Sequence, residues 1–289
     1  MKISKSLPVL VTGATGYIAG WVVKNLLDEG ITVHAPIRDL ANTQKRIHLD
    51  KLAEDSSGEI KYFESDLMIE DSYKEAMKGC ELVIHTASPF VMDSKDPQKE
   101  VIEPALKGTQ NVLKTVNETE SVKRVVLTSS VAAIYGNGID GQSVEGGMFN
   151  ESMWNTTSTS TDGEYSYSKT IAEKEAWKIC GEQKRWDLVV INPGFVLGPS
   201  LNPNALFESK KFMLQMGNGD LKSGAPDITM GMVDVRDVSQ AHVIAGFSET
   251  AKGRHILSAG THTLLETGGF IKENLVINTL FRQETRLNF

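Results

Sequence analysis

The sequence of 289 residues contains little cysteine, few aromatic residues, no long apolar run and no excess of positive charge. Its two cysteines, Cys80 and Cys180, are 100 positions apart, which excludes a disulfide framework or a metal site built from cysteine pairs. We expect two reduced thiols that pack as small apolar side chains. No apolar stretch approaches the roughly 20 residues of a membrane span, so no membrane partner is predicted. With 30 Lys and Arg against 37 Asp and Glu, the net charge is −7, which argues against a nucleic-acid partner.

The remaining composition is that of an ordinary globular protein. Hydrophobic residues make up 40% and charged residues 23%, which excludes wholesale disorder. The first apolar stretch ends at Gly13, too soon for a secretory signal, and we therefore expect a cytoplasmic protein, either a monomer or a homodimer. The six histidines show neither an HExxH motif nor paired ligand spacing, so no metal site is predicted.

Segments with the pattern of β-strands alternate with helical segments through the first two thirds of the chain. The strand-like segments are 8–12, 31–38, 60–66, 82–88, 123–130 and 187–199, and the helical ones are 21–30, 72–80, 100–118 and 165–179. Strands separated by helices form right-handed crossovers, which predicts an α/β fold with a Rossmann-type doubly wound parallel sheet. We assign 1–198 to a dinucleotide-binding core. We assign 199–289 to a small, irregular and shortened substrate lobe, of which about 230–260 packs back on the core.

Two further segments differ from this alternation. Residues 136–163 are rich in Gly, Ser, Thr and Asn and are too many for a simple connection, so a loop that is either functional or mobile is predicted. Residues 231–246 have the pattern of a strand that turns into a helix. Asp237 is placed to cap that helix.

A glycine-rich turn follows the first predicted strand. Its residues are Gly13, Ala14, Thr15, Gly16, Tyr17, Ile18 and Ala19. Glycines let the backbone approach a pyrophosphate, and the N–H groups and dipole at the start of the next helix stabilise its charge. The alternative is a plain strand–helix turn. Because the flanking strand, the helix and the further alternation are all present, we predict nucleotide binding.

The end of the second predicted strand indicates which dinucleotide is bound. Where a site that prefers NAD has an acidic residue, this chain has Arg38, whose guanidinium suits a 2′-phosphate, and Lys45 adds a second positive charge. We therefore predict NADP (NADPH). Alternatively, Arg38 is an exposed surface residue and Asp39 reaches a ribose hydroxyl. Asp66 and Leu67 end the third strand, where they either flank the adenine or form a strand-end turn.

Ser130, Tyr165 and Lys169 form a candidate catalytic set. Tyr165 and Lys169 are four residues apart at the start of a helix and therefore share one face. A carbonyl that receives hydride needs a proton donor, and a neighbouring ammonium brings the pKa of a phenol toward the working range. Lys169 is also placed to bond the nicotinamide ribose, and the Ser130 hydroxyl would hold the substrate oxygen.

Alternatives exist within this set. Tyr167 is a second tyrosine, but its partner at the same spacing is Ile171. Ser129 is next to Ser130, but adjacent strand residues point to opposite faces, and we favour Ser130. The break at Pro193, before Val196, either contacts the nicotinamide carboxamide or ends a strand.

In combination these motifs resemble the extended short-chain dehydrogenase/reductase family. The match is closest to its branch of dihydroflavonol, cinnamoyl-CoA and methylglyoxal (aldehyde) reductases. The motifs are VTGATGYIAGWVV, PIRD, SDL, HTASPF, RVVLTSS, YSYSK, INPGFVLGP and VDVRDVSQAH. The resemblance implies a Rossmann fold, NADPH, and reduction of an aldehyde or ketone by Ser130, Tyr165 and Lys169. It also places around the cofactor Gly13 to Ile18, Arg38, Asp66, Leu67, Thr86, Ala87, Val196 and Ser209.

Two departures from this branch bear on the substrate. EYSYSK differs from cinnamoyl-CoA reductases, and VAAIYGNGIDG is not a flavonoid-enzyme pattern, so we favour a general reductase of small aldehydes or ketones. The final segment, TGGFIKENLVINTLFRQETRLNF, predicts an altered terminus and a partly open substrate pocket. Two other hypotheses stay open: an NAD-dependent sugar-nucleotide epimerase or dehydratase, and a non-catalytic dinucleotide-binding sensor.

Overall fold

The computed structural model describes residues 1–88, 94–202, 204–220, 224–226, 228–275 and 286–287. Two residues of the HTASPF motif, Pro89 and Phe90, and most of the unusual final segment lie outside these ranges. No helix within them is both long and apolar enough to cross a membrane. Cys80 and Cys180 are both free thiols.

Strands and helices alternate along the chain, as the sequence pattern predicts. The strands are β1 (Val9–Thr12), β2 (Val33–Ile37), β3 (Ile60–Glu64), β4 (Leu82–His85), β5 (Arg124–Thr128), β6 (Asp187–Pro193), β7 (Phe195–Leu197), β8 (Ala225–Pro226), β9 (Thr229–Asp234), β10 (Gly253–Leu257), β11 (Gly260–Thr263) and β12 (Arg286–Leu287). The α-helices are α1 (Tyr17–Asp28), α2 (Ile47–Glu54), α3 (Lys74–Met77), α4 (Glu103–Glu118), α5 (Glu164–Gly181), α6 (Glu208–Asn218), α7 (Val235–Phe247) and α8 (Leu264–Leu275). Shorter helical turns are η1 (Thr43–Lys45), η2 (Gln98–Ile102), η3 (Val131–Ala133), η4 (Gly138–Ser143) and η5 (Glu145–Gly147).

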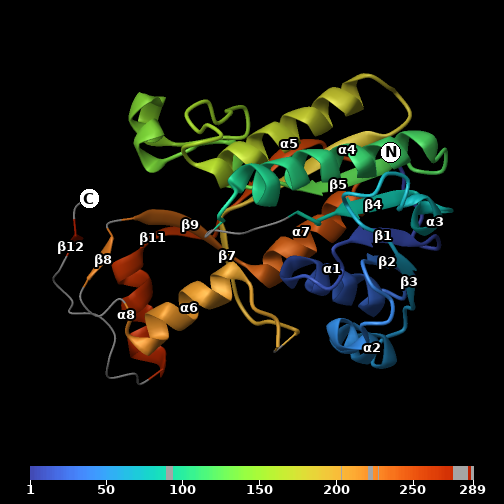
Figure 1. Cartoon of the computed structure of the whole chain (residues 1–289), viewed down its shortest axis with the longest axis horizontal. Helices are drawn as coiled ribbons and strands as arrows, with labels where there is room; N and C mark the ends of the chain where they lie inside the picture. Colours follow the sequence, from blue (N-terminus) through green and yellow to red (C-terminus); the bar gives the residue numbers. More distant parts are fainter. Residues whose placement is uncertain (89–93, 203, 221–223, 227, 276–285, 288–289) are drawn as a thin grey trace.

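A seven-stranded sheet in the order β10-β6-β5-β4-β1-β2-β3 forms the centre of the molecule (Figure 1). All of its neighbouring strands run parallel. The direction of winding reverses between β1 and β4, and in such sheets ligands bind at the carboxyl ends of the strands beside that point. The predicted doubly wound α/β fold is confirmed.

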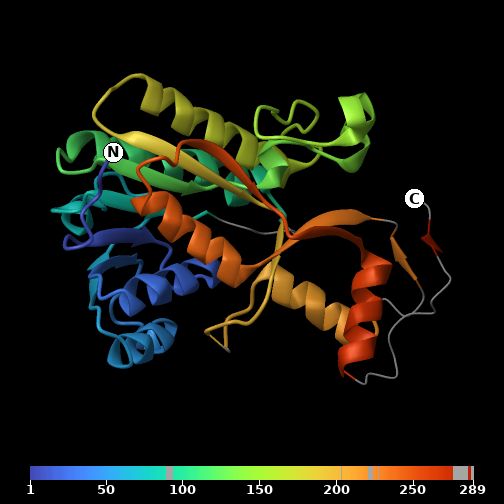
Figure 2. The same ribbon diagram turned by 180° about the vertical axis from the view of Figure 1, so that it is seen from behind.

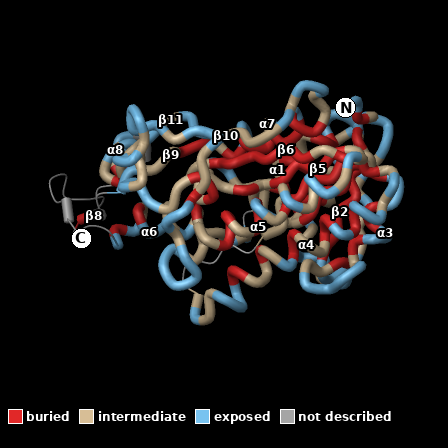
Figure 3. Tube along the Cα trace, turned by 90° about the horizontal axis from the view of Figure 1, so that it is seen from above, coloured by how far each residue is buried: buried red, intermediate tan, exposed pale blue. Residues whose placement is uncertain are grey.

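Apolar side chains from alternate strand positions build one core on each face of the sheet. Val9 and Val11 of β1 pack with α1 and α7, whereas Leu10 packs with α4 and α5. Figure 3 shows the buried residues concentrated along the strands of this sheet. The carboxyl ends of the strands are therefore held by two packed layers, which gives the residues that follow them fixed positions.

A smaller lobe lies beside the carboxyl ends of the strands and is seen from behind in Figure 2. It contains the sheet β11-β9-β7, the pair β12-β8, and the helices α6 and α8. Between β9 and β11 the chain returns once to the core and adds two elements to it: α7 packs on α1, and β10 pairs with β6. The lobe is less irregular than the sequence predicts, because α6 forms in the loop-rich segment and ends at Gly219, whose φ is 85°.

Three local predictions were wrong. No element was predicted for the polar stretch that contains α2, where only His48 and Leu49 are buried and the apolar face is too narrow to recognise. The helix predicted at 72–80 is a single turn, α3. The cap of α7 is Asp234 and not Asp237, because β9 continues to Asp234, whose carboxylate accepts a 2.8 Å hydrogen bond from the Arg236 N–H.

Candidate active site

The turn between β1 and α1 has the backbone geometry of an anion cradle. Gly13 has a φ of +67°, and a Cβ atom there would lie 3.1 Å from the Cα of Ala87. Gly16 begins α1 without a capping side chain, and the first turn of the helix holds no acidic residue. The first N–H groups of α1 are thus available to a negatively charged group, and these residues fit a dinucleotide pyrophosphate.

Thr12 fixes the opposite wall of the cradle. Its hydroxyl oxygen accepts hydrogen bonds of 3.1 Å from the N–H groups of both Thr86 and Ala87. Because those two bonds use both lone pairs of the oxygen, its hydroxyl hydrogen is donated to Nδ1 of the buried His85 at 2.8 Å. Burial, with a smaller contribution from Lys169, lowers the pKa of His85 to about 3, so the ring is neutral with its proton on Nε2. The motifs did not identify Thr12 and His85 as functional residues.

The residues expected to choose the cofactor lie on exposed turns. Arg38 follows β2, and Lys45 ends η1. The Asp39 carboxylate accepts a 2.9 Å hydrogen bond from the Ala41 N–H, which gives it a structural role in the turn. Asp66 likewise accepts a 2.7 Å bond from a backbone N–H two residues on, and Leu67 packs on α4. Arg38 and Lys45 are therefore the basic side chains offered at this edge.

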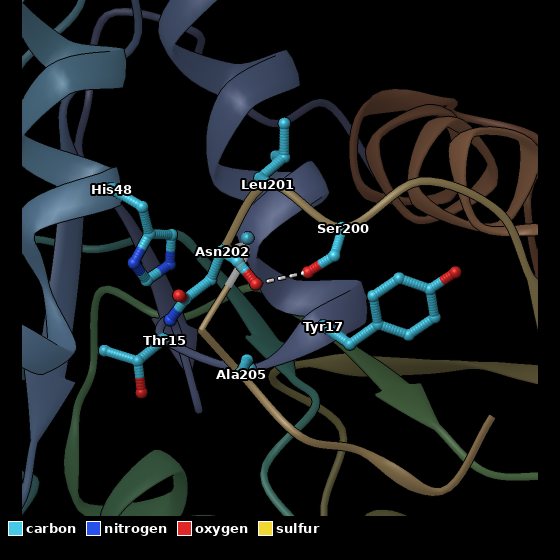
Figure 4. Close-up of a pocket in the computed structure, with 9 residues that line it drawn as sticks. Thr15, Tyr17, His48, Ser200, Leu201, Asn202 and Ala205 are labelled. Atoms are coloured by element: carbon cyan, nitrogen blue, oxygen red, sulfur yellow. Dashed lines mark hydrogen bonds between the residues drawn. The ribbon is translucent and has the colours of Figure 1, made fainter. Parts of the chain in front are cut away.

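The segment after β7 passes over the cradle and encloses a small pocket (Figure 4). The Tyr17 hydroxyl donates to the Gly198 carbonyl at 2.8 Å, and Trp21 donates to the Pro199 carbonyl at 2.9 Å. The pocket is lined by Thr15, Gly16, Tyr17, Gly20, His48, Ser200, Leu201, Asn202 and Ala205. The side chain of Tyr17, predicted beside the cofactor, thus also ties α1 to the lobe.

Ser130, Tyr165 and Lys169 converge beyond the carboxyl end of β5. The Ser130 side chain lies near enough to the Tyr165 hydroxyl to favour the ionised phenol and lower its pKa. The Ser130 Oγ also accepts a 3.1 Å bond from the Ala132 N–H, which fixes its orientation. The Lys169 Nζ lies 5.7 Å from the centre of the Tyr165 ring, one helical turn along α5. A phenol, a hydroxyl and an ammonium therefore meet at one place.

Burial sets the protonation of this cluster. It raises the pKa of Tyr165 to about 12, although the Ser130 side chain acts in the opposite direction. It lowers the pKa of Lys169 to about 8, although the Glu173 carboxylate acts in the opposite direction. At neutral pH, Tyr165 therefore holds its proton beside a charged Lys169. This is the state that a proton donor to a developing alkoxide requires.

The geometry separates the alternatives within the set. The buried Ser129 hydroxyl points away from Tyr165 and donates to Glu173 at 2.5 Å. Tyr167 is two positions from Tyr165 and therefore lies on a different face of α5. Of the two serines, Ser130 therefore faces Tyr165. Of the two tyrosines, Tyr165 faces Ser130.

A small cavity lies between Ala87, at the wall of the cradle, and Lys169 of the catalytic set. It lies between β4, β5 and α5, and its lining includes Ala87, which faces Gly13, and also Lys169 and Glu173. Ser129 also lines this cavity, whereas Ser130 and Tyr165 do not. Within the described ranges, no group of three or more His, Cys, Asp or Glu side chains could hold a metal ion.

The remaining predicted residues lie where the core meets the lobe. Pro193 ends β6, and Val196 pairs with Val233 between β7 and β9. Ser209 is buried in the first turn of α6. Sequence reasoning missed Glu173, although its position four residues after Lys169 on the same helix face was a usable signal.

The chain is similar to known reductases in sequence and in structure. Residues 10–256 match the model of the 3-beta hydroxysteroid dehydrogenase/isomerase family. The chain is 42% identical to cinnamoyl-CoA reductase CAD2 of Medicago truncatula, over 86% of this chain and 75% of that protein. It is 36% identical to tetraketide alpha-pyrone reductase 1 of Arabidopsis thaliana, over 97% of this chain and 86% of that protein. Yeast methylglyoxal/isovaleraldehyde reductase Gre2, solved with NADPH, superposes with a TM-score of 0.82 at 27% identity, over 96% of this chain and 86% of that one.

Proposed function

The chain belongs to the 3-beta hydroxysteroid dehydrogenase/isomerase family, and from this membership we propose that it transfers hydride from NADPH to a small aldehyde or ketone, with Tyr165 as the proton donor. The extended short-chain dehydrogenase/reductase family predicted from the motifs is confirmed. The chain is an NAD(P)-dependent reductase of the branch that includes cinnamoyl-CoA and methylglyoxal reductases. The substrate, the cofactor preference and the residue roles are the proposal.

The observation that carries the proposal is the convergence of Ser130, Tyr165 and Lys169 beyond the carboxyl end of β5, where Lys169 and Ala87 of the cradle wall line the same small cavity. Bound NADPH would supply the hydride. Ser130 would donate a hydrogen bond to the carbonyl oxygen, and Tyr165 would pass its proton to the same oxygen as negative charge develops there. Lys169 would stabilise the resulting phenolate by its charge and hold the nicotinamide ribose.

NADPH is proposed over NADH because the side chains offered beyond β2 are basic. A planar guanidinium forms two charge-assisted bonds to a phosphate, and Arg38 is exposed where a 2′-phosphate would lie. The solved relative Gre2 carries NADPH. The residues proposed to hold the cofactor are Gly13, Ala14, Thr15, Gly16, Tyr17, Ile18, Arg38, Lys45, Asp66, Leu67, Thr86, Ala87, Tyr165, Lys169, Pro193, Val196 and Ser209.

The proposed substrate class rests on what the relatives share. Their names record different carbonyl substrates, from a cinnamoyl thioester to methylglyoxal, on one fold. They share the reduction of a carbonyl group. In this chain, that reaction would need a substrate carbonyl within reach of the Tyr165 hydroxyl.

A matched NADPH and NADH oxidation screen tests this function. Small aldehydes, α-dicarbonyls and aryl ketones are offered at equal concentration, and absorbance at the nicotinamide band is followed. We expect turnover with at least one aldehyde or ketone and faster turnover with NADPH. Equal use of NADH, or NAD retained through purification, would favour the epimerase hypothesis, and dinucleotide binding without turnover would favour the sensor.

A further inference from the structure

A buried ion pair lies directly behind the candidate catalytic set. The Glu173 side chain has no exposed surface, and that of Arg254 is 7% exposed. The Arg254 Nε donates to the Glu173 Oε1 at 2.6 Å, and the Trp177 Nε1 donates to the same oxygen at 3.2 Å. Arg254 comes from β10, 81 residues further along the chain than Glu173 on α5. The pair therefore joins the edge of the sheet to the helix that carries Tyr165.

The second carboxylate oxygen of Glu173 faces the strand that carries Ser130. Glu173 Oε2 accepts the Ser129 hydroxyl at 2.5 Å and the Asn192 side-chain amide at 2.9 Å. The same Asn192 amide group donates to the Ser130 carbonyl at 3.0 Å. Because both partners are acceptors, the amide must present its NH₂ to them. Two links thus run from one carboxylate, one to the Ser129 hydroxyl and one through Asn192 to the Ser130 carbonyl.

Arg254 extends the same network to the long loop before α5. Its guanidinium donates to the carbonyls of Glu151, at 3.0 Å, and Met153, and it stacks 3.9 Å from the centre of the Trp154 ring. It also donates to the Ala133 carbonyl at 3.3 Å, in the turn that follows Ser130. One guanidinium therefore fixes both segments that border the catalytic set.

We propose that Glu173, held by Arg254, is a positioning residue for the reaction: its carboxylate fixes the Ser130 end of β5 against the helix that carries Tyr165 and Lys169. This inference rests on the proposed function. Ser130 and Tyr165 belong to separate elements, and joint action on one carbonyl oxygen requires that these elements keep their relative positions. Small misplacements of reacting groups lower the reaction rate steeply. The link from Glu173 to the Ser130 end of β5 therefore acts on the chemical step.

The same carboxylate acts on the charge of Lys169. Among the residues that the structure describes, the charged or titratable groups facing the Lys169 ammonium are Glu173 and Tyr165 on its own helix and His85 on β4. Burial lowers the pKa of Lys169, and Glu173 counteracts that effect. His85 is neutral in this environment and supplies no compensating charge. Replacing Glu173 with a neutral residue therefore lowers the pKa of Lys169 further.

The test compares Glu173→Gln with Asp187→Asn in the full chain. Asp187 forms the second buried-arginine pair, with Arg124 at 2.7 Å, at the opposite end of β5 from Ser130. For Glu173→Gln we expect kcat to fall about 10- to 100-fold while KM for NADPH stays within about twofold. The alkaline limb of its kcat profile moves to lower pH. Asp187→Asn, which lowers thermal stability, keeps the parental kcat and pH profile.

Hydrogen exchange of the peptide spanning 129–135 gives a readout that does not need turnover. Exchange there is expected to be faster in Glu173→Gln and unchanged in Asp187→Asn. Parental kcat, pH profile and exchange in Glu173→Gln, or equal loss of kcat in both variants, overturn the inference and leave the proposed function standing. If the parent enzyme turns over no carbonyl, the proposed function fails, and the exchange rates alone decide the positioning role.

If Glu173→Gln does not fold, Ser129→Ala replaces it as the variant that tests the positioning role. It removes one of the two links and leaves the ion pair with Arg254 in place. We expect kcat to fall about threefold to tenfold, less than in Glu173→Gln, because the link through Asn192 still holds the Ser130 carbonyl. A parental kcat in Ser129→Ala overturns the inference.

Discussion

Gly13→Ala tests the cradle in the most direct way, because two separate structural effects add at this position. The φ of +67° strains an alanine by about 1–2 kcal/mol. The new methyl group also meets three atoms of Ala87 at 3.1–3.2 Å, and overpacking of this kind costs about 1–3 kcal/mol. Ala87 cannot yield easily because its N–H is bonded to Thr12. The sum is about 2–5 kcal/mol, a large share of the roughly 5–15 kcal/mol that stabilises a typical domain.

Substitutions at two other glycines separate the cost of backbone strain from the cost of steric overlap. Gly79 has a φ of +76° but no atom within 4 Å of an added Cβ, so Gly79→Ala is expected to lose only the backbone cost of about 1–2 kcal/mol. Gly181 ends α5 with neither a positive φ nor a neighbour within 4 Å, so Gly181→Ala should stay within about 1 kcal/mol of the parent.

The assay is urea unfolding of the three variants, together with NADPH titration followed by protein fluorescence. Gly13→Ala should be the least stable and should bind NADPH at least about tenfold more weakly, because 1.4 kcal/mol of lost contact is tenfold in Kd. The other two variants should bind NADPH as the parent does. The reasoning is refuted if Gly13→Ala loses no more stability than Gly79→Ala and keeps the parental Kd.

Three further predictions concern charge. Arg38→Ala should raise KM for NADPH about tenfold to a hundredfold and leave KM for NADH nearly unchanged; a parallel change in both would contradict the proposed phosphate contact. Because the pKa of Lys169 is about 8 and that of Tyr165 about 12, kcat for reduction should fall as pH rises through about 8, and a rate that rises there would be contrary to this. Burial lowers the pKa of His85 to about 3 and that of His242 to about 4, below the ordinary 6.5. Between pH 6.5 and pH 4 the unfolded chain therefore binds more protons at these histidines than the folded chain does. The free energy of unfolding should fall as pH drops through this range, by up to about 1.4 kcal/mol per pH unit for each histidine. His242→Gln should reduce that slope in urea unfolding measured across this range, and an unchanged slope would exclude its contribution.

The parts of the fold that were predicted correctly depend on local sequence patterns. The run before Gly13 is apolar and rich in β-branched residues, and a strand followed by a glycine turn and a helix needs no distant partner to be recognised. The spacing of Tyr165 and Lys169 is equally local. The cap of α7 depends on where β9 stops pairing with β7, at Leu197 opposite Asp234, so Asp234 could not be chosen over Asp237 from the segment alone.

The parts that could not be predicted depend on pairing between distant segments. Arg254 reaches Glu173 only because β10 joins the sheet beside β6, after the chain has left the core and returned. The cover over the cradle likewise depends on Tyr17 meeting Gly198, 181 residues away. No periodicity or motif in either segment records these contacts.

The central claim is that Tyr165 gives the proton to the reduced carbonyl. The deciding measurement is single-turnover NADPH oxidation by Tyr165→Phe and Tyr167→Phe. Each substitution removes one phenolic hydroxyl from α5, at a different position. A general acid contributes about 10²- to 10⁴-fold to rate, so Tyr165→Phe should lose at least that factor while Tyr167→Phe stays within about threefold of the parent. Equal rates in the two variants would contradict the account.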